Sequence, residues 1–249
     1  MTVTTFSRTA GVPNIPDIPD RELYRPRFSP WRGTEGEFGE LMQRIRPFTL
    51  VSEESCFALF SLARQAAQLP GEFWECGVHQ GGSAVLLAEV LRRHRPDGQP
   101  PCLRLFDTFT GMPPIDPDHD LYYPKRDERA AEELDSLVAV RERLAPYSDV
   151  GIEFHPGLLP ETFAGQESAR IALAHIDMDL YRSIQGACEF LYPRLVPGGV
   201  LVFDDYGYPS CPGARRAVDE FFADKPEVPL ISPTAQALVF KLPAFPAPE

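Results

Sequence analysis

The chain has 249 residues, enough for one large domain or for one domain with an appendage, and 43% of them are hydrophobic, so a sizeable core can form. The formal net charge of −12 makes a phosphate backbone an unfavourable partner, so nucleic-acid binding is not expected. No apolar run approaches the length that spans a bilayer, so membrane association is not expected either.

The five cysteines are scattered along the chain and form no CxxC pair. This usage predicts reduced thiols, with no disulfide framework and no zinc site. The first twenty residues contain no apolar stretch of the kind found in signal peptides. Together these features predict a cytoplasmic protein.

The first 35 residues read as an arm without a regular helix, because prolines interrupt it throughout. One interpretation is a disordered leader. The aromatic residues Tyr24, Phe28 and Trp31 instead favour a segment that wraps a neighbouring subunit or covers the functional site. At the other end, residues 244–249 are expected to form a frayed tail.

A helical region follows the arm at 36–70, and segments of strand-like and helix-like pattern alternate over 71–243. Ser52 is expected to cap one helix, with Glu53 and Glu54 at its positive end. The predicted helices cover residues 35–45, 53–69, 81–94, 127–145, 180–195 and 213–222. The predicted strands cover residues 71–78, 102–109, 150–155, 170–177, 198–205, 228–233 and 236–242.

This alternation predicts an α/β fold, a doubly wound and mostly parallel sheet with helices on both faces. The strands are short apolar runs, which is typical of strands buried on both faces. The last two strands are separated by a short turn, so a C-terminal antiparallel hairpin is expected. The segment 112–126 has no regular pattern and the length of a lid or binding loop.

A glycine turn follows the strand at 71–78, and Gly77, Gly81 and Ser83 would let backbone amides approach a ligand closely. The spacing does not match the GxGxxG dinucleotide fingerprint. Glu75 suits the amino group of S-adenosylmethionine (SAM), and Asp107, which ends the next strand, suits ribose hydroxyls. Asp107 would suit the ribose of NAD as well, and a tight turn needed for packing would explain the glycines. The combination favours SAM.

Two strands end on carboxylates, one at Asp177 and the next at Asp204 and Asp205. If these strands are neighbours, the three carboxylates converge, and oxygen ligands of this kind select Mg²⁺ or Ca²⁺ over zinc. Adjacent strand residues point to opposite faces, so Asp204 and Asp205 share a cation only if the chain turns there. The alternative is that Asp205 caps the next turn and only Asp204 binds the ion.

Asp179 lies two residues after Asp177, in the turn, where a free carboxylate would act as a general base. An N-cap for the helix that follows is an equally supported role. His175 lies within an apolar strand and is expected to be a core histidine. The sequence contains no GxSxG, HExxH or Walker motif, which excludes the commonest hydrolase, zincin and kinase-like functions.

Several motifs in this order resemble the macrocin O-methyltransferase (TylF/MycF-like) family. They are GEFWECGVHQGGS, LFDTFTGMP, HIDMDLYRS, GGVLVFDDYG and CPGARRAVDEF, and they fall within roughly residues 45 to 225. The family also includes sugar methyltransferases of aminocoumarin and enediyne antibiotic pathways. The resemblance implies a Rossmann-like class I methyltransferase domain over residues 71–243 and, together with the N-terminal arm, a homo-oligomer.

The resemblance also implies SAM as the methyl donor, Mg²⁺ as a cofactor, and methylation of a sugar hydroxyl on a glycosylated natural product. It places the metal ligands at Asp177, Asp204 and Asp205 and the base at Asp179. The acids of the glycine turn and of the next strand become SAM contacts. The alternatives are an NAD(P)-dependent oxidoreductase or sugar epimerase, and a non-catalytic SAM-binding protein.

Overall fold

The computed structural model describes residues 29–121 and 136–243, and the architecture below belongs to the unit Trp31–Glu249. Its helices are α2 (Gly36–Ile45), α3 (Glu53–Ala66), α4 (Gly82–His94), α6 (Ser136–Leu144), α7 (Tyr181–Leu191) and α8 (Pro212–Phe222). Its strands are β1 (Glu72–Cys76), β2 (Cys102–Asp107), β3 (Gly151–Pro156), β4 (Ile171–Ile176), β5 (Leu195–Phe203), β6 (Leu230–Ile231) and β7 (Ala237–Phe240).

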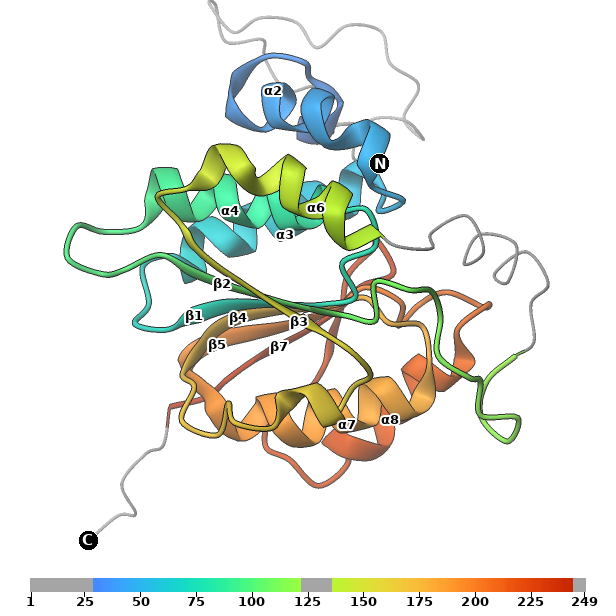
Figure 1. Cartoon of the computed structure of the whole chain (residues 1–249). Helices are drawn as coiled ribbons and strands as arrows, with labels where there is room; N and C mark the ends of the chain where they lie inside the picture. Colours follow the sequence, from blue (N-terminus) through green and yellow to red (C-terminus); the bar gives the residue numbers. More distant parts are fainter. Residues whose placement is uncertain (1–28, 122–135, 244–249) are drawn as a thin grey trace, which may run out of the picture. The chain divides into compact units, whose positions relative to one another are not determined.

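The seven strands form one sheet in the order β3-β2-β1-β4-β5-β7-β6. The pairs β3–β2, β2–β1, β1–β4 and β4–β5 are parallel, and β7 is antiparallel to both β5 and β6. Helices α2, α3, α4 and α6 lie on one face of the sheet, and α7 and α8 lie on the other (Figure 1). The predicted doubly wound sheet with a C-terminal antiparallel hairpin is therefore confirmed.

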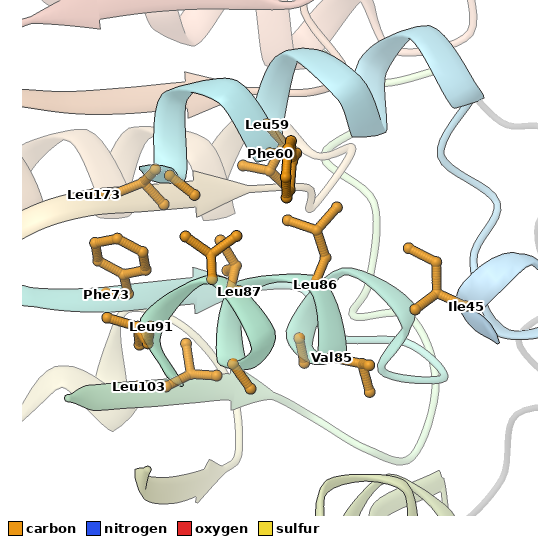
Figure 2. Packing of buried hydrophobic residues seen from close by; sticks show 14 of the residues in the cluster. Ile45, Leu59, Phe60, Phe73, Val85, Leu86, Leu87, Leu91, Leu103 and Leu173 are labelled. Atoms are coloured by element: carbon orange, nitrogen blue, oxygen red, sulfur yellow. The ribbon is translucent and has the colours of Figure 1, made fainter. Parts of the chain in front are cut away.

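Each face of the sheet has its own apolar core, because strands buried on both sides offer side chains to both layers of helices. All six residues of β4 are buried. On one face, Leu59 of α3 and Leu86 and Leu91 of α4 pack towards Phe73 of β1 and Leu173 of β4 (Figure 2). The opposite cluster gathers residues of α7 and α8 around β4 and β5.

The N-terminal helices α2 and α3 belong to the first of these two cores, the one that contains Phe73 and Leu173. The Ser52 hydroxyl accepts a hydrogen bond from the Ser55 N–H at 3.2 Å, which confirms the predicted cap of α3. Trp31 packs against the same cluster, with its ring centroid 6.2 Å from that of Phe57. The two other arm aromatics, Tyr24 and Phe28, lie outside the described residues, as does most of the predicted arm.

The predicted helix 127–145 is described only for its second half, as α6. The predicted helix 180–195 ends earlier as an α-helix, at Leu191, and one turn of 3₁₀ helix follows. Among the described residues, none of the helices has both the length and the apolar character needed to cross a bilayer.

Candidate functional site

An open pocket of about 330 Å³ lies at the carboxyl ends of the parallel strands, where ligands bind in open α/β sheets. Five strand ends contribute to its wall, through the last residue of the strand or through the loop that follows it. One residue from each of these ends is, in chain order, Gly77, Asp107, Gly157, Asp177 and Asp204. The sheet therefore brings together motifs that are more than one hundred residues apart in the sequence.

Four carboxylates line this pocket after β4 and β5, namely Asp177, Asp179, Asp204 and Asp205. The Asp204 N–H donates to the carbonyl of Ile176 at 2.9 Å, which ties the ends of the two strands together. The Asp179 N–H donates to Oδ2 of Asp205 at 2.8 Å. The chain bends at Asp204 and Asp205, so both residues reach the same pocket despite being adjacent.

Burial raises the pKa of Asp177 well above its usual range, and the charges of Asp205 and Asp204 raise it further. The pKa of Asp205 is also raised, by burial and then by the charges of Asp179 and Asp204. Among the described residues, no lysine or arginine lines the pocket. The charge of the buried His175 offsets only part of this rise in pKa for both carboxylates. Clustered oxygen donors of this kind suit a hard divalent cation, so the residues fit Mg²⁺.

Asp179 adopts a left-handed backbone conformation, with φ of 60°. Its Oδ1 accepts a hydrogen bond from the thiol of Cys211 at 2.9 Å. Burial, followed by the charge of Asp179, raises the pKa of this thiol, so the sulfur remains a protonated donor. One donor atom each of Asp179, Asp205 and Cys211 lie within 4.8 Å of one another. No pattern in the sequence indicated a role for Cys211 beyond that of a reduced thiol.

Asp179 is not the N-cap of α7, because the cap position belongs to Leu180. The first N–H of the helix, at Tyr181, donates instead to Oδ1 of Asp120 at 2.9 Å. The other oxygen of Asp120 accepts the Asp116 N–H at 2.9 Å. A loop residue distant in sequence therefore caps α7 and leaves the Asp179 carboxylate at the pocket.

The same loop is held against α7 by two further contacts. The Arg182 Nε lies 2.8 Å from Oδ2 of Asp116. The His119 ring stacks on the ring of Tyr181 with centroids 3.9 Å apart. These contacts position the described part of the predicted lid, whereas residues 122–126 of that segment lie outside the described residues.

The glycine turn after β1 is shaped by close packing. Gly77 has a φ of 88°, and a Cβ built there would lie 1.8 Å from the Asp177 carbonyl oxygen. Only glycine fits this approach of two strand ends. Gly81 has a φ of 84° at the N-cap of α4, and Ser83 is buried in the first turn of that helix. Gly77 and Ser83 line the pocket.

The carboxylate of Asp107 lines the pocket and also connects two loops. Its Oδ2 accepts the N–H groups of Val78 at 2.6 Å and His79 at 2.9 Å. Its Oδ1 accepts the Phe109 N–H at 2.8 Å. Any ribose contact made by this carboxylate would use the lone pairs that these bonds leave.

Glu75 occupies a different position from the other acids. Its side chain is fully buried within the sheet and does not line the pocket. Its Oε1 lies 3.1 Å from Nδ1 of His175, which is also fully buried. The expectation that His175 is a core histidine is therefore confirmed. A direct contact between Glu75 and SAM stays a prediction.

A family model described as Macrocin-O-methyltransferase (TylF) matches residues 58–233. The 8-demethyl-8-(2,3-dimethoxy-alpha-L-rhamnosyl)-tetracenomycin-C 4'-O-methyltransferase of Streptomyces olivaceus is 33% identical over 158 residues, which are 61% of this chain and 58% of that protein. The Mycinamicin III 3''-O-methyltransferase of Micromonospora griseorubida is 31% identical over 159 residues, 61% of each chain. The chain thus spans less than two thirds of the length of these relatives.

Two solved structures are similar in fold. The O-methyltransferase NovP superposes with a TM-score of 0.64 at 24% identity, over 79% of this chain and 83% of that one. CalS11, a calicheamicin methyltransferase, superposes with a TM-score of 0.64 at 22% identity, over 83% of this chain and 93% of that one. The likeness shows a shared Rossmann-like fold.

Proposed function

Because the chain belongs to the macrocin O-methyltransferase (TylF) family, we propose that it is a SAM-dependent and Mg²⁺-dependent O-methyltransferase. Its acceptor would be a sugar hydroxyl of a glycosylated natural product. The observation that carries this proposal is the cluster of four carboxylates at the carboxyl ends of the parallel strands. It lines the same pocket as the glycine turn and Asp107. Relatives named as methyltransferases of antibiotic sugars support it.

The metal ligands in this proposal are Asp177, Asp204 and Asp205. When bound there, Mg²⁺ would supply Lewis-acid chemistry that lowers the pKa of the attacked hydroxyl. The bend of the chain at Asp204 and Asp205 supports the use of both residues. The hydrogen bond from the Asp179 N–H holds Oδ2 of Asp205 at a defined place in the pocket wall.

In the methyl transfer, a sugar oxygen forms a bond to the methyl carbon as the bond from that carbon to the SAM sulfur breaks. The hydroxyl proton passes to the carboxylate of Asp179, which acts as general base. The Cys211 thiol donates to Oδ1 of Asp179, and Asp179 lines the pocket in which the acceptor would bind. The pocket wall contributes mainly by keeping nucleophile, methyl group and leaving sulfur in line.

The rim of the pocket favours an acceptor that carries an apolar aglycone. Three large side chains that line it are exposed to solvent, at 64% for Leu50, 48% for Leu158 and 38% for Tyr208. An apolar aglycone would cover this rim and remove its surface from water.

Two broader features of the proposal rest on other observations. The five cysteines are free thiols, which supports a reducing compartment such as the cytoplasm. Homo-oligomerisation is proposed from the N-terminal arm and is measured by light scattering of the purified chain.

A mass-spectrometric screen tests the function. The chain, SAM and a panel of rhamnosylated aglycones and nucleotide-linked sugars are incubated with Mg²⁺ or with EDTA. A glycoside should gain one CH₂ group in mass, and EDTA should abolish the product. Asp179→Asn should retain SAM and Mg²⁺ binding by calorimetry but lower the rate about 100-fold or more. The matched control is Asp224→Asn, an exposed carboxylate paired with Lys225.

Two results would reverse the proposal. SAM at a hundredfold excess over Kd should stabilise the fold by about 2.7 kcal/mol. A thermal shift with NADH and none with SAM would favour the oxidoreductase or epimerase. Binding of SAM without turnover of any acceptor and without Mg²⁺ binding would favour a non-catalytic SAM-binding protein.

A further inference from the structure

A row of buried polar side chains crosses the sheet and includes Asp204, one of the four carboxylates of the pocket. Glu75 on β1 pairs in register with His175 on β4. On the next strands, Phe203 pairs with Ala237, so Asp204 follows β5 where Gln236 precedes β7. Glu75, His175 and Gln236 are fully buried, and Asp204 is only 4% exposed. Two of these residues lie in adjacent strands, and the other two directly adjoin the ends of the next two strands.

The contacts along this row converge on one oxygen of Asp204. The Gln236 Nε2 donates to Oδ1 of Asp204 at 2.7 Å. The His175 Nε2 lies 3.7 Å from the same oxygen, an ion-pair distance at which it makes no hydrogen bond, and its Nδ1 lies 3.1 Å from Oε1 of Glu75. Oδ1 of Asp204 is therefore held from within the sheet, which leaves Oδ2 for the pocket that Asp204 lines.

This row of buried polar residues lowers the stability of the fold. Oε2 of Glu75 is buried and has no hydrogen-bond partner among the described residues. A buried polar atom without a partner destabilises the fold, whereas apolar side chains of similar size would suit the core of a parallel sheet. The rest of β4 is apolar, Ile171 to Ile176 with His175 as the exception. A destabilising polar network of this kind is expected where it orients the residues of a functional site.

We propose that Gln236 and His175 are positioning residues for Asp204, and that Glu75 fixes the His175 ring. They hold Asp204 with Oδ1 towards the sheet and Oδ2 towards a divalent cation in the pocket. The inference rests on the proposed function, because it takes Asp204 as a metal ligand. It assigns Glu75 an indirect role, in which Glu75 acts through His175 on the metal ligand Asp204. This role would replace the direct SAM contact expected from sequence.

Direct Mn²⁺ binding to the SAM-free chain, followed by electron paramagnetic resonance, tests this without any turnover. Gln236→Met keeps the shape of the side chain and removes the donor to Asp204. It should weaken Mn²⁺ binding about tenfold or more, as losses of second-sphere hydrogen bonds do. Glu75→Gln should also weaken it, but less than Gln236→Met does, because it loosens only the far end of the row.

Glu227→Gln is the matched control, since Glu227 is also buried but contacts Tyr192 and Lys241 instead of the row. It should alter the unfolding midpoint without altering Mn²⁺ affinity. Urea unfolding of each variant measures the folded fraction, and Glu75→Gln carries the test if Gln236→Met does not fold.

Asp204→Asn separates the two possible failures. If Asp204→Asn loses Mn²⁺ binding while folded Gln236→Met and Glu75→Gln bind as the unaltered chain does, the positioning role is wrong and the metal site stands. If Asp204→Asn itself binds Mn²⁺ normally, both the metal site and the positioning role are wrong.

Discussion

Glu89 on α4 offers a prediction about acid stability whose size follows from its contacts. The side chain is fully buried, yet Arg92 Nη2 lies 2.6 Å and Arg44 Nη2 lies 3.3 Å from its Oε2. Burial alone would raise the pKa of Glu89. Hydrogen bonds from Arg92 and Tyr147, with the charge of Arg44, outweigh burial and lower it from 4.5 to about 2. This shift corresponds to an upper bound of about 3 kcal/mol of stability at neutral pH.

The sign of the pH dependence follows from the lowered pKa. The stabilisation by Glu89 is fully present above the unfolded-state pKa of 4.5 and is lost as the pH falls through the folded-state value of about 2. Glu89→Gln, which cannot ionise, should therefore be less stable than the unaltered chain at neutral pH. The gap in unfolding free energy should shrink by about 2 kcal/mol between about pH 7 and about pH 3.

Urea titrations of both proteins across this pH range measure the gap, because all other titrating groups are shared. Glu142→Gln, at an exposed position of α6, is the control and should differ from the unaltered chain by less than about 0.5 kcal/mol. A gap between Glu89→Gln and the unaltered chain that stays constant with pH would refute the reasoning.

Two further variants test how the loops around the pocket are held. Gly77→Ala should destabilise the fold by about 4 kcal/mol or more, since its Cβ would overlap the Asp177 carbonyl oxygen; a loss below about 1 kcal/mol by urea unfolding would mean that the two loops separate easily. Asp120→Ala should cost about 1 kcal/mol in the same assay because it removes the cap of α7, and Asp120→Asn should restore part of it. Equal losses for Asp120→Ala and Asp120→Asn would show that the cap contributes nothing.

Much of the fold was accessible from the sequence because each strand and helix carries its own pattern. The capping of α3 by Ser52 and the antiparallel hairpin followed from local chemistry. The position of β7 between β5 and β6 did not, because a hairpin pattern says which strands pair with each other but not which of them joins the sheet. That choice depends on contacts distant in sequence.

The candidate site shows the same limit. That Asp177 and Asp204 lie at the same edge of the sheet could be predicted, since parallel strands present their carboxyl ends at one edge. That their strands are neighbours was a condition of the prediction, which the strand order meets. The inward direction of Glu75 could not, because a strand too short for a clear alternation does not reveal which face a residue takes. The pairing of Cys211 with Asp179, and of Asp120 with the start of α7, joins segments that only the folded chain brings together.

The bonds that Asp107 makes to the amides of Val78 and His79 bear on how variants of this residue are interpreted. Replacing Asp107 would remove the hydrogen bonds that connect two neighbouring loops, and it would also remove any ribose contact. A fall in SAM affinity alone would therefore not identify Asp107 as a ligand-binding group. Only a variant that preserves the amide bonds while altering ribose recognition, or a donor analogue lacking one hydroxyl, can distinguish scaffolding from recognition at this position.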